Sequence, residues 1–299
     1  MDKKYHQQVR LLLEMLPFVM KEDCFALKGG TALNLFMWNF PRLSVDIDLT
    51  YVPLDARETA LKNIDSGLAN IKKNIEKARS DLKVMLQGKK LSIHAKGVAP
   101  VKIEPNTILR GTLYPIVRKD LASKVEDEFK LSVLDVPMLS LADLYGGKIV
   151  AALDRQHPRD LFDVKMLFDN DGLTDDIRKA FLVYLISHDR PMHEVLRPNL
   201  QNIDIIFEGE FLGMTSEPIA LDVLIKTRES LIEQIHATLT QDEKEFLMSF
   251  KRGEPNWLLL GVTGVEALPA VQWKLKNIKT MINDRKGLML EKLGNALII

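Results

Sequence analysis

The sequence has 299 residues, of which 46% are hydrophobic and 27% are charged, and its 41 basic and 41 acidic side chains give a formal net charge of zero. This composition is that of a globular protein with an ample core, and it excludes binding of polyanions through bulk charge. No apolar run approaches the roughly 20 residues that span a bilayer, so we expect no membrane association. The single cysteine, Cys24, cannot form an internal disulfide, which favours a cytoplasmic location.

Charge is unevenly distributed along the chain. Residues 61–130 contain 15 Lys or Arg against 8 Asp or Glu, whereas residues 201–250 contain 3 against 10. A basic surface on one part of the molecule can attract nucleic acid while the whole remains neutral. A solvated helix face explains the lysines of 62–90 equally well.

In chain order, residues 4–20 have apolar side chains at helical spacing and predict a first helix. An apolar run that ends in Lys28 then predicts a strand, followed by Gly29-Gly30 and a short helix that begins near Thr31. Such a helix start leaves free backbone N–H groups, and glycines allow a ligand to approach them, so the segment suits a phosphate. An ordinary glycine turn is the simpler interpretation.

The next extended stretch contains two aspartates. Asp46 and Asp48 are two residues apart in a predicted strand, so their carboxylates project from the same face while Ile47 points into the core. Two like charges this close favour a cation between them, and Mg²⁺ or Mn²⁺ is the expected ion because hard cations prefer carboxylate oxygens. The alternative is a solvated strand end without a metal.

Beyond this strand we expect a long helix from about Asp55 to about Leu86, then strands at 91–97 and 100–109. A helix that begins near residue 137 ends before Pro158, which cannot continue it, and a second helix follows. Lys148 lies on the first of these helices, directly after Gly146-Gly147. From residue 170 the chain is predicted to be helical, with a capping box at Thr240 and Glu243.

The residues between 28 and 49 resemble the active-site pattern of the DNA polymerase β-like nucleotidyltransferases. The sequence KGGTAL, followed by RLSVDIDL, is similar to that of the AbiEii/AbiGii toxin branch of type IV toxin–antitoxin systems, which includes the mycobacterial MenT toxins. A second block is similar to the same branch at Lys148, Arg155, Arg159, Asp160 and Asp163. The similarity extends loosely to the C-terminal Pro-Ala-x-x-Trp-Lys segment.

This resemblance implies an α+β fold, with a mixed-sheet nucleotidyltransferase core at residues 1–135 and a helical domain at 136–299 that together line a cleft. It implies metal ligation by Asp46 and Asp48 and assistance from a third acid on a neighbouring strand, for which Glu104 is the candidate. It further implies that Lys148, Asp160 and Asp163 belong to the active site. The implied nucleotide-binding residues are Lys28, Gly29, Gly30, Thr31, Arg42, Ser44 and Lys148. The alternative for the second block is a structural salt-bridge network between two helices.

The implied activity is transfer of a nucleoside monophosphate from an NTP to a hydroxyl, with release of pyrophosphate. The 3′ end of tRNA is the expected acceptor, which would block translation and growth in phage defence, and an antitoxin encoded alongside is the expected protein partner. Two alternatives remain. One is transfer to a small molecule or a protein hydroxyl, and the other is a non-catalytic module that binds a nucleotide or an antitoxin.

Overall fold

The computed structural model describes residues 3–298. Segments between Phe25 and Met138 in which apolar and polar residues alternate form one mixed sheet. In this part of the chain the sheet has seven strands in the order β3-β4-β5-β2-β1-β7-β6. The strands are β1 (Phe25–Lys28), β2 (Asp46–Tyr51), β3 (Lys83–Gln87), β4 (Lys90–His94), β5 (Val101–Asn106), β6 (Val117–Lys119) and β7 (Val136–Met138). The α+β fold class expected from the sequence is confirmed.

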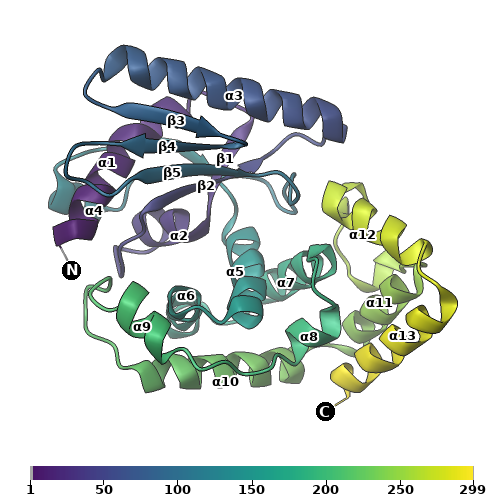
Figure 1. Cartoon of the computed structure of the whole chain (residues 1–299). Coiled ribbons are helices and arrows are strands. Elements are labelled where there is room, and N and C mark those ends of the chain that lie inside the picture. Colours follow the sequence, from purple (N-terminus) through teal and green to yellow (C-terminus); the bar gives the residue numbers. More distant parts are fainter. Residues whose placement is uncertain (1–2, 299) are drawn as a thin grey trace. The chain divides into compact units, whose positions relative to one another are not determined.

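Helices accompany the sheet in the first part of the chain. They are α1 (Lys3–Val19), α2 (Gly29–Thr31), the π-helical turn η1 (Ala32–Met37), α3 (Arg57–Ala78) and α4 (Ser123–Phe129). Helices α1 and α3 contact each other and pack on strands of the sheet (Figure 1). Their apolar stripes are buried there, with Leu12, Leu16, Ile64 and Ile71 almost fully removed from solvent.

The later part of the chain is helical, as predicted. It contains α5 (Leu141–Arg155), α6 (Pro158–Asp169), α7 (Asp175–Ser187), α8 (Met192–Leu196), α9 (Asp204–Glu210), α10 (Leu221–Thr238), α11 (Gln241–Arg252), the 3₁₀ turns η2 (Trp257–Leu259) and η3 (Val265–Ala267), α12 (Pro269–Lys279) and α13 (Asn283–Leu297). Helix α6 packs on α10, α7 on α12, and α13 on both α8 and α11. The predicted capping box at the start of α11 is confirmed.

The chain forms two compact units. The first ends at Leu144 and also includes Leu212–Pro218, and the second comprises Tyr145–Phe211 and the chain from Ile219 onward. The returning segment joins the first unit through backbone hydrogen bonds, among them Leu43 N–H to the carbonyl of Met214 at 2.8 Å. The predicted domains, 1–135 and 136–299, stay a prediction.

Two elements differ from expectation. The helix that starts near residue 57 ends at Ala78, because the pattern changes to the strand period at Leu82 and Val84, and β3 then pairs with β4 in a hairpin. The two-residue turn of this hairpin contains Gly88 at φ +57°, the positive φ that tight hairpins require. Residues 136–138 are also a strand, where a helix start is predicted.

Within residues 3–298 no helix combines the length and the apolar character that crossing a bilayer requires.

Candidate active site

The two predicted aspartates lie on one face of β2, near the middle of the sheet order. Asp46 and Asp48 are partly exposed, whereas Ile47 between them is fully buried, so the predicted alternation is confirmed. The strand register places Asp48 opposite Lys28 of β1 and opposite Glu104 of β5. Because opposed residues on neighbouring strands share a face, a lysine and a second carboxylate flank Asp48.

A pocket of about 280 Å³ is present at this point of the first unit. It is lined by Lys28, Asp48, Glu104, Pro105, Asn106, Thr107 and Ile108. The pocket therefore brings together three residues that the sequence analysis places far apart in the chain. Asp46 is not among the lining residues, although it shares the face of β2 with Asp48.

Sequence reasoning missed one cation at this pocket. Lys90 Nζ lies 3.8 Å from Glu104 Oε1, and the two side chains are about half exposed. Lys90 reaches this place because β4 pairs with β5. The pairing of β4 with β5 has no local sequence signal. Only a correct prediction of that pairing would have placed Lys90 beside Glu104.

The diglycine turn lies directly against Asp48. Gly29 has φ +73°, and a Cβ at this position would lie 2.3 Å from Asp48 Oδ2. Any side chain here would displace the carboxylate, so glycine is required for both conformation and space. The predicted phosphate-binding role of Gly29 and Gly30 remains a prediction.

Three predicted nucleotide-binding side chains are buried behind this turn. Thr31, Arg42 and Ser44 are 0%, 2% and 8% exposed. The hydroxyl of Thr31 donates to the carbonyl of Asp46 at 2.6 Å, and a Cβ on Gly30 would lie 2.6 Å from Arg42 Nη2. These side chains support the turn and β2 from within and do not line the pocket; their contact with a nucleotide stays a prediction.

The second predicted cluster lies in the helical unit. Lys148 Nζ on α5 is 2.7 Å from Asp160 Oδ1 and 3.0 Å from Asp163 Oδ2, both on α6. Arg155 Nε is 2.6 Å from Asp160 Oδ2, whereas Arg159 lies outside the cluster, near Glu210. Lys148 is 8% exposed and both aspartates are 1% exposed, so this is a buried ion network.

The charge state of Asp160 follows from its neighbours. Burial alone would raise the pKa of this carboxyl, but Lys148 and Arg155 outweigh burial and hold the pKa well below its usual range. The position in the first turn of α6 also favours a negative charge. Asp160 is therefore ionised at neutral pH.

The glycines before Lys148 have a packing role. A Cβ on Gly146 would lie 2.7 Å from the backbone carbon of Ala180, so α5 and α7 are in close backbone contact there. A Cβ on Gly147 would make an ordinary contact with the ring of Tyr184, at 3.4 Å. The predicted cleft between Lys148 and the carboxylate strand remains a prediction, because the two clusters lie in different units.

The carboxylates of β2 and β5 are the ligand type that Mg²⁺ or Mn²⁺ prefers. Among residues 3–298, no group of three or more His, Cys, Asp or Glu side chains can hold a metal by itself. Mg²⁺ in nucleotide enzymes commonly uses one or two carboxylates and completes its shell with phosphates and water. The residues present therefore fit an ion that binds together with an NTP.

Comparison with known proteins relates this geometry to one family. The family model described as the nucleotidyl transferase AbiEii toxin of type IV toxin–antitoxin systems matches residues 10–277. Among solved structures, the chain is similar to the nucleotidyltransferase toxin MenT4 from Mycobacterium tuberculosis H37Rv. The TM-score is 0.63 with 13% identity, over 93% of this chain and 95% of that one, so the match shows a shared fold. No curated protein sequence matched the chain.

Proposed function

The chain belongs to the AbiEii family of nucleotidyltransferase toxins of type IV toxin–antitoxin systems, and from this premise we propose that its substrates are an NTP and the 3′ end of tRNA. Family membership makes the chain a nucleotidyltransferase rather than a non-catalytic binding module. The observation that carries the proposal is the pocket of the first unit, where Asp48, Glu104 and Lys28 meet beside the diglycine turn.

In the proposed reaction, the acceptor hydroxyl oxygen bonds to the α-phosphorus of the NTP. The bond from that phosphorus to the pyrophosphate oxygen breaks, and the hydroxyl proton leaves to a base. Glu104 is the candidate base because it lines the pocket next to Asp48 and is 41% exposed. Lys28, which lines the pocket, and Lys90, which lies 3.8 Å from Glu104, would provide positive charge for the triphosphate.

Asp46 and Asp48 would hold the divalent ion together with the NTP phosphates. A bound Mg²⁺ or Mn²⁺ lowers the pKa of an attacking hydroxyl and neutralises charge on the phosphates. The requirement for two aspartates explains why the chain keeps like charges two residues apart on one strand face.

The cellular role follows from the acceptor. A nucleotide added to the 3′ end of tRNA prevents aminoacylation there, so translation and growth would stop, and such a block would serve phage defence. NTPs and tRNA are present in the cytoplasm, which is the proposed location. An antitoxin encoded alongside is the proposed regulator of the toxin.

The proposal is tested by labelling. The purified chain is incubated with each α-³²P-labelled NTP in turn, with Mg²⁺, Mn²⁺ or EDTA, and with tRNA, total RNA or no RNA. The expected product is labelled tRNA that forms only with a metal. Asp46→Asn and Asp48→Asn should each reduce labelling by roughly 100-fold or more while the melting temperature is kept, because the metal loses a ligand.

Asp127→Asn is the matched control, since Asp127 belongs to the same unit and is 84% exposed on the surface. It should label tRNA as the parent does. If both β2 variants also label tRNA at the parent rate, the metal role of these aspartates is wrong. Label that appears without RNA would instead indicate transfer to a small molecule or to a protein hydroxyl.

A further inference from the structure

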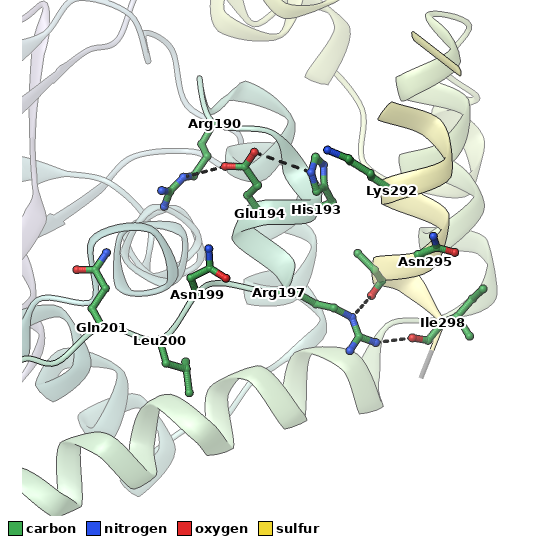
Figure 2. Close-up of a pocket in the computed structure, with 11 residues that line it drawn as sticks. Arg190, His193, Glu194, Arg197, Asn199, Leu200, Gln201, Lys292, Asn295 and Ile298 are labelled. Carbon is green, nitrogen blue, oxygen red and sulfur yellow. Dashed lines mark hydrogen bonds and ion pairs between the residues drawn. The ribbon is translucent and has the colours of Figure 1, made fainter. Parts of the chain in front are cut away.

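A second and larger pocket lies entirely within the helical unit. Its volume is about 910 Å³, and its walls are α8, the segment 197–201 that follows, and the C-terminal half of α13 (Figure 2). This size is within the range of roughly 300–1,000 Å³ typical of small-molecule sites. The catalytic residues proposed above do not line it.

The charged side chains of this pocket give it a positive balance. Arg190, Arg197 and Lys292 line it with a single carboxylate, Glu194. That carboxylate is shared, because Glu194 lies 3.4 Å from Arg190 Nε and 3.9 Å from the ring of His193. Figure 2 shows Glu194 between these two side chains, and the ammonium group of Lys292 pointing toward His193.

Two of the cations are not neutralised by carboxylates in the described part of the chain. Arg197 donates to the carbonyls of Ala296, at 3.0 Å, and of Ile298, which fixes its position but leaves its charge. Lys292 is exposed, and none of the carboxylates of residues 3–298 lies in ion-pair range of it. A phosphate is a ligand that would pair with an exposed cation such as Lys292.

One further lysine acts on the pocket wall electrostatically. Lys251 on α11 is 7% exposed, and its charge disfavours a proton on His193. Burial lowers the pKa of His193, Glu194 raises it, and Lys292 and Lys251 lower it again. An anion in the pocket would offset this positive charge beside His193.

The rest of the lining is suited to a base. Asn199, Gln201 and Asn295 line the pocket, and each has a side-chain carboxamide that can both donate and accept a hydrogen bond. Leu200, which is 55% exposed, adds an apolar surface beside them. A nucleobase needs this combination of paired polar groups and apolar contact, whereas an acidic peptide would use only the cations.

Buried side chains fix the backbone of the segment 197–201, which carries Asn199, Leu200 and Gln201. Gln156, which is 1% exposed, donates to the carbonyl of Asn199 at 2.8 Å and accepts from the N–H of Gln201 at 3.0 Å. Arg228 Nη1 donates to Gln156 Oε1 and to the carbonyl of Gln201, each at 2.8 Å. The backbone is therefore fixed by buried polar groups, which lowers the entropy cost of ligand binding.

We propose that this pocket binds one nucleotide unit, with its phosphate beside Lys292 and its base against Asn199, Gln201 and Leu200. The unit is either a free mononucleotide or one residue of an RNA strand. This site is additional to the proposed catalytic pocket and does not depend on it, because it lies in the other unit and uses no metal ligand.

The test measures binding by the full-length chain in EDTA, so that the metal-dependent catalytic site is not engaged. The probes are a short fluorescein-labelled single-stranded RNA and, separately, CMP, AMP and an oligo-glutamate peptide, over a series of salt concentrations. Lys292→Gln removes one cation, and Asn295→Asp adds a negative charge without changing side-chain size. Both residues are exposed, so the fold should be kept, as the melting temperature will show. Lys279→Gln, an exposed lysine of α12 outside the pocket, is the matched control.

Each pocket variant is expected to weaken binding roughly fivefold, and Lys292→Gln should reduce the slope of log K against log salt by about 0.7, the value for one phosphate contact on a single strand. If the variants weaken the binding of RNA but not of CMP or AMP, the pocket binds a residue of an RNA strand. If they weaken the binding of CMP or AMP, it binds a free nucleotide. The pKa of His193, followed by NMR, should rise when the probe binds, because the phosphate adds negative charge beside it.

Binding of every probe by both variants at the parent affinity would overturn the proposal. So would a dependence on Lys292 seen only with an oligo-glutamate peptide, which would make the pocket a site for an acidic peptide. Failure of the labelling reaction with intact probe binding would contradict the catalytic proposal alone.

Discussion

At the scale of single residues, the position of Asp48 depends on the absence of a side chain at Gly29. The Cβ of an alanine would lie 2.3 Å from Asp48 Oδ2, and the backbone there is at φ +73°. Gly97 has nearly the same backbone, at φ +76°, but a Cβ at that position meets nothing within 4 Å. An alanine at Gly97 therefore tests backbone strain alone, whereas an alanine at Gly29 tests the same strain together with displacement of the Asp48 carboxylate.

We predict that Gly29→Ala and Gly97→Ala each reduce the free energy of unfolding by about 1 kcal/mol, the usual strain of alanine at positive φ. Only Gly29→Ala should also reduce nucleotidyl transfer, by roughly 100-fold, because a displaced carboxylate no longer holds the reacting groups. The measurements are urea denaturation and the tRNA-labelling rate per folded molecule. Equal rates for the two variants would mean that the position of Asp48 does not control the reaction.

The buried network around Asp160 gives a prediction about pH. The pKa of Asp160 is lower in the folded state than in the unfolded chain, where it is near 4. A carboxyl with a lowered folded pKa stabilises the protein above the unfolded pKa, and this stabilisation is lost as the pH falls below about 4. Part of the acid denaturation of this protein should therefore come from Asp160.

Asp160→Asn should reduce the free energy of unfolding at neutral pH by about 1–3 kcal/mol, because Lys148 loses one carboxylate partner but keeps Asp163. The difference from the parent should shrink as the pH falls through 4. Asp169→Asn, on the same helix but half exposed and paired with Lys165 one turn away, should change stability by less than about 0.5 kcal/mol. Denaturant midpoints over a pH series test this, and a difference that does not change with pH would contradict it.

At the scale of elements, the sequence pattern succeeded where periodicity is strong and local. The helix at residues 4–20 and the strand with Asp46 and Asp48 occur as predicted, because their apolar side chains follow one period throughout. The strand at 100–109 is confirmed as β5 even though it contains Pro105. This proline lies beyond the residues of β5 that pair with β4, so no ladder bond to β4 is lost.

The misplaced elements have different causes. Residues 83–87 pair with the neighbouring β4 through a two-residue turn at Gly88, a local hairpin signal that the prediction of a longer helix overlooked. Residues 136–138 are instead a strand because β1 and β6, which are distant in the chain, pair with them, and local spacing carries no information about those partners. The same limit applies to the site: Asp48 and Glu104 are recognisable as acids in strands, but Lys90 enters through strand pairing alone.

The contact between α5 and α7 provides a prediction at this scale. In a helix interior, alanine is favoured over glycine by about 1 kcal/mol. At Gly146 this gain is opposed by a contact of 2.7 Å with the backbone of Ala180, which can be relieved only by moving a helix. At Gly147 the nearest atom belongs to the Tyr184 side chain, at 3.4 Å.

Gly146→Ala should therefore lower the free energy of unfolding by about 1–3 kcal/mol, as overpacking does. Gly147→Ala should leave it unchanged or raise it by up to about 1 kcal/mol. Thermal and urea denaturation of the two variants provide the measurement. A stabilised Gly146→Ala variant would show that the two helices are not in close contact in solution.

At the scale of the whole molecule, a net charge of zero conceals an excess of basic residues in one region and of acidic residues in another. The structure shows that part of the basic excess is already paired. Lys72 pairs with Glu76, Lys89 with Asp65, and Lys90 with Glu104. Lys73 and Lys77 are exposed one turn apart on α3, and no carboxylate of residues 3–298 pairs with them.

The final prediction concerns RNA as acceptor. If α3 binds RNA phosphates, Lys73→Glu combined with Lys77→Glu should raise the KM for tRNA and reduce its salt dependence by roughly 0.7–0.9 in log–log slope for each phosphate that is no longer neutralised. The KM for the NTP should not change, since neither lysine lines the catalytic pocket. Lys90→Glu should instead raise the KM for the NTP, because Lys90 lies beside Glu104.

Lys226→Glu is the matched control, since Lys226 is 75% exposed in the acidic stretch of α10 and should not bind a polyanion. Initial rates of tRNA labelling at several salt concentrations provide both constants for every variant. An unchanged slope and KM in the double variant would exclude α3 from RNA binding. The phosphates would then have to be bound by other basic surfaces, and the pocket beside Lys292 would be the next one to test.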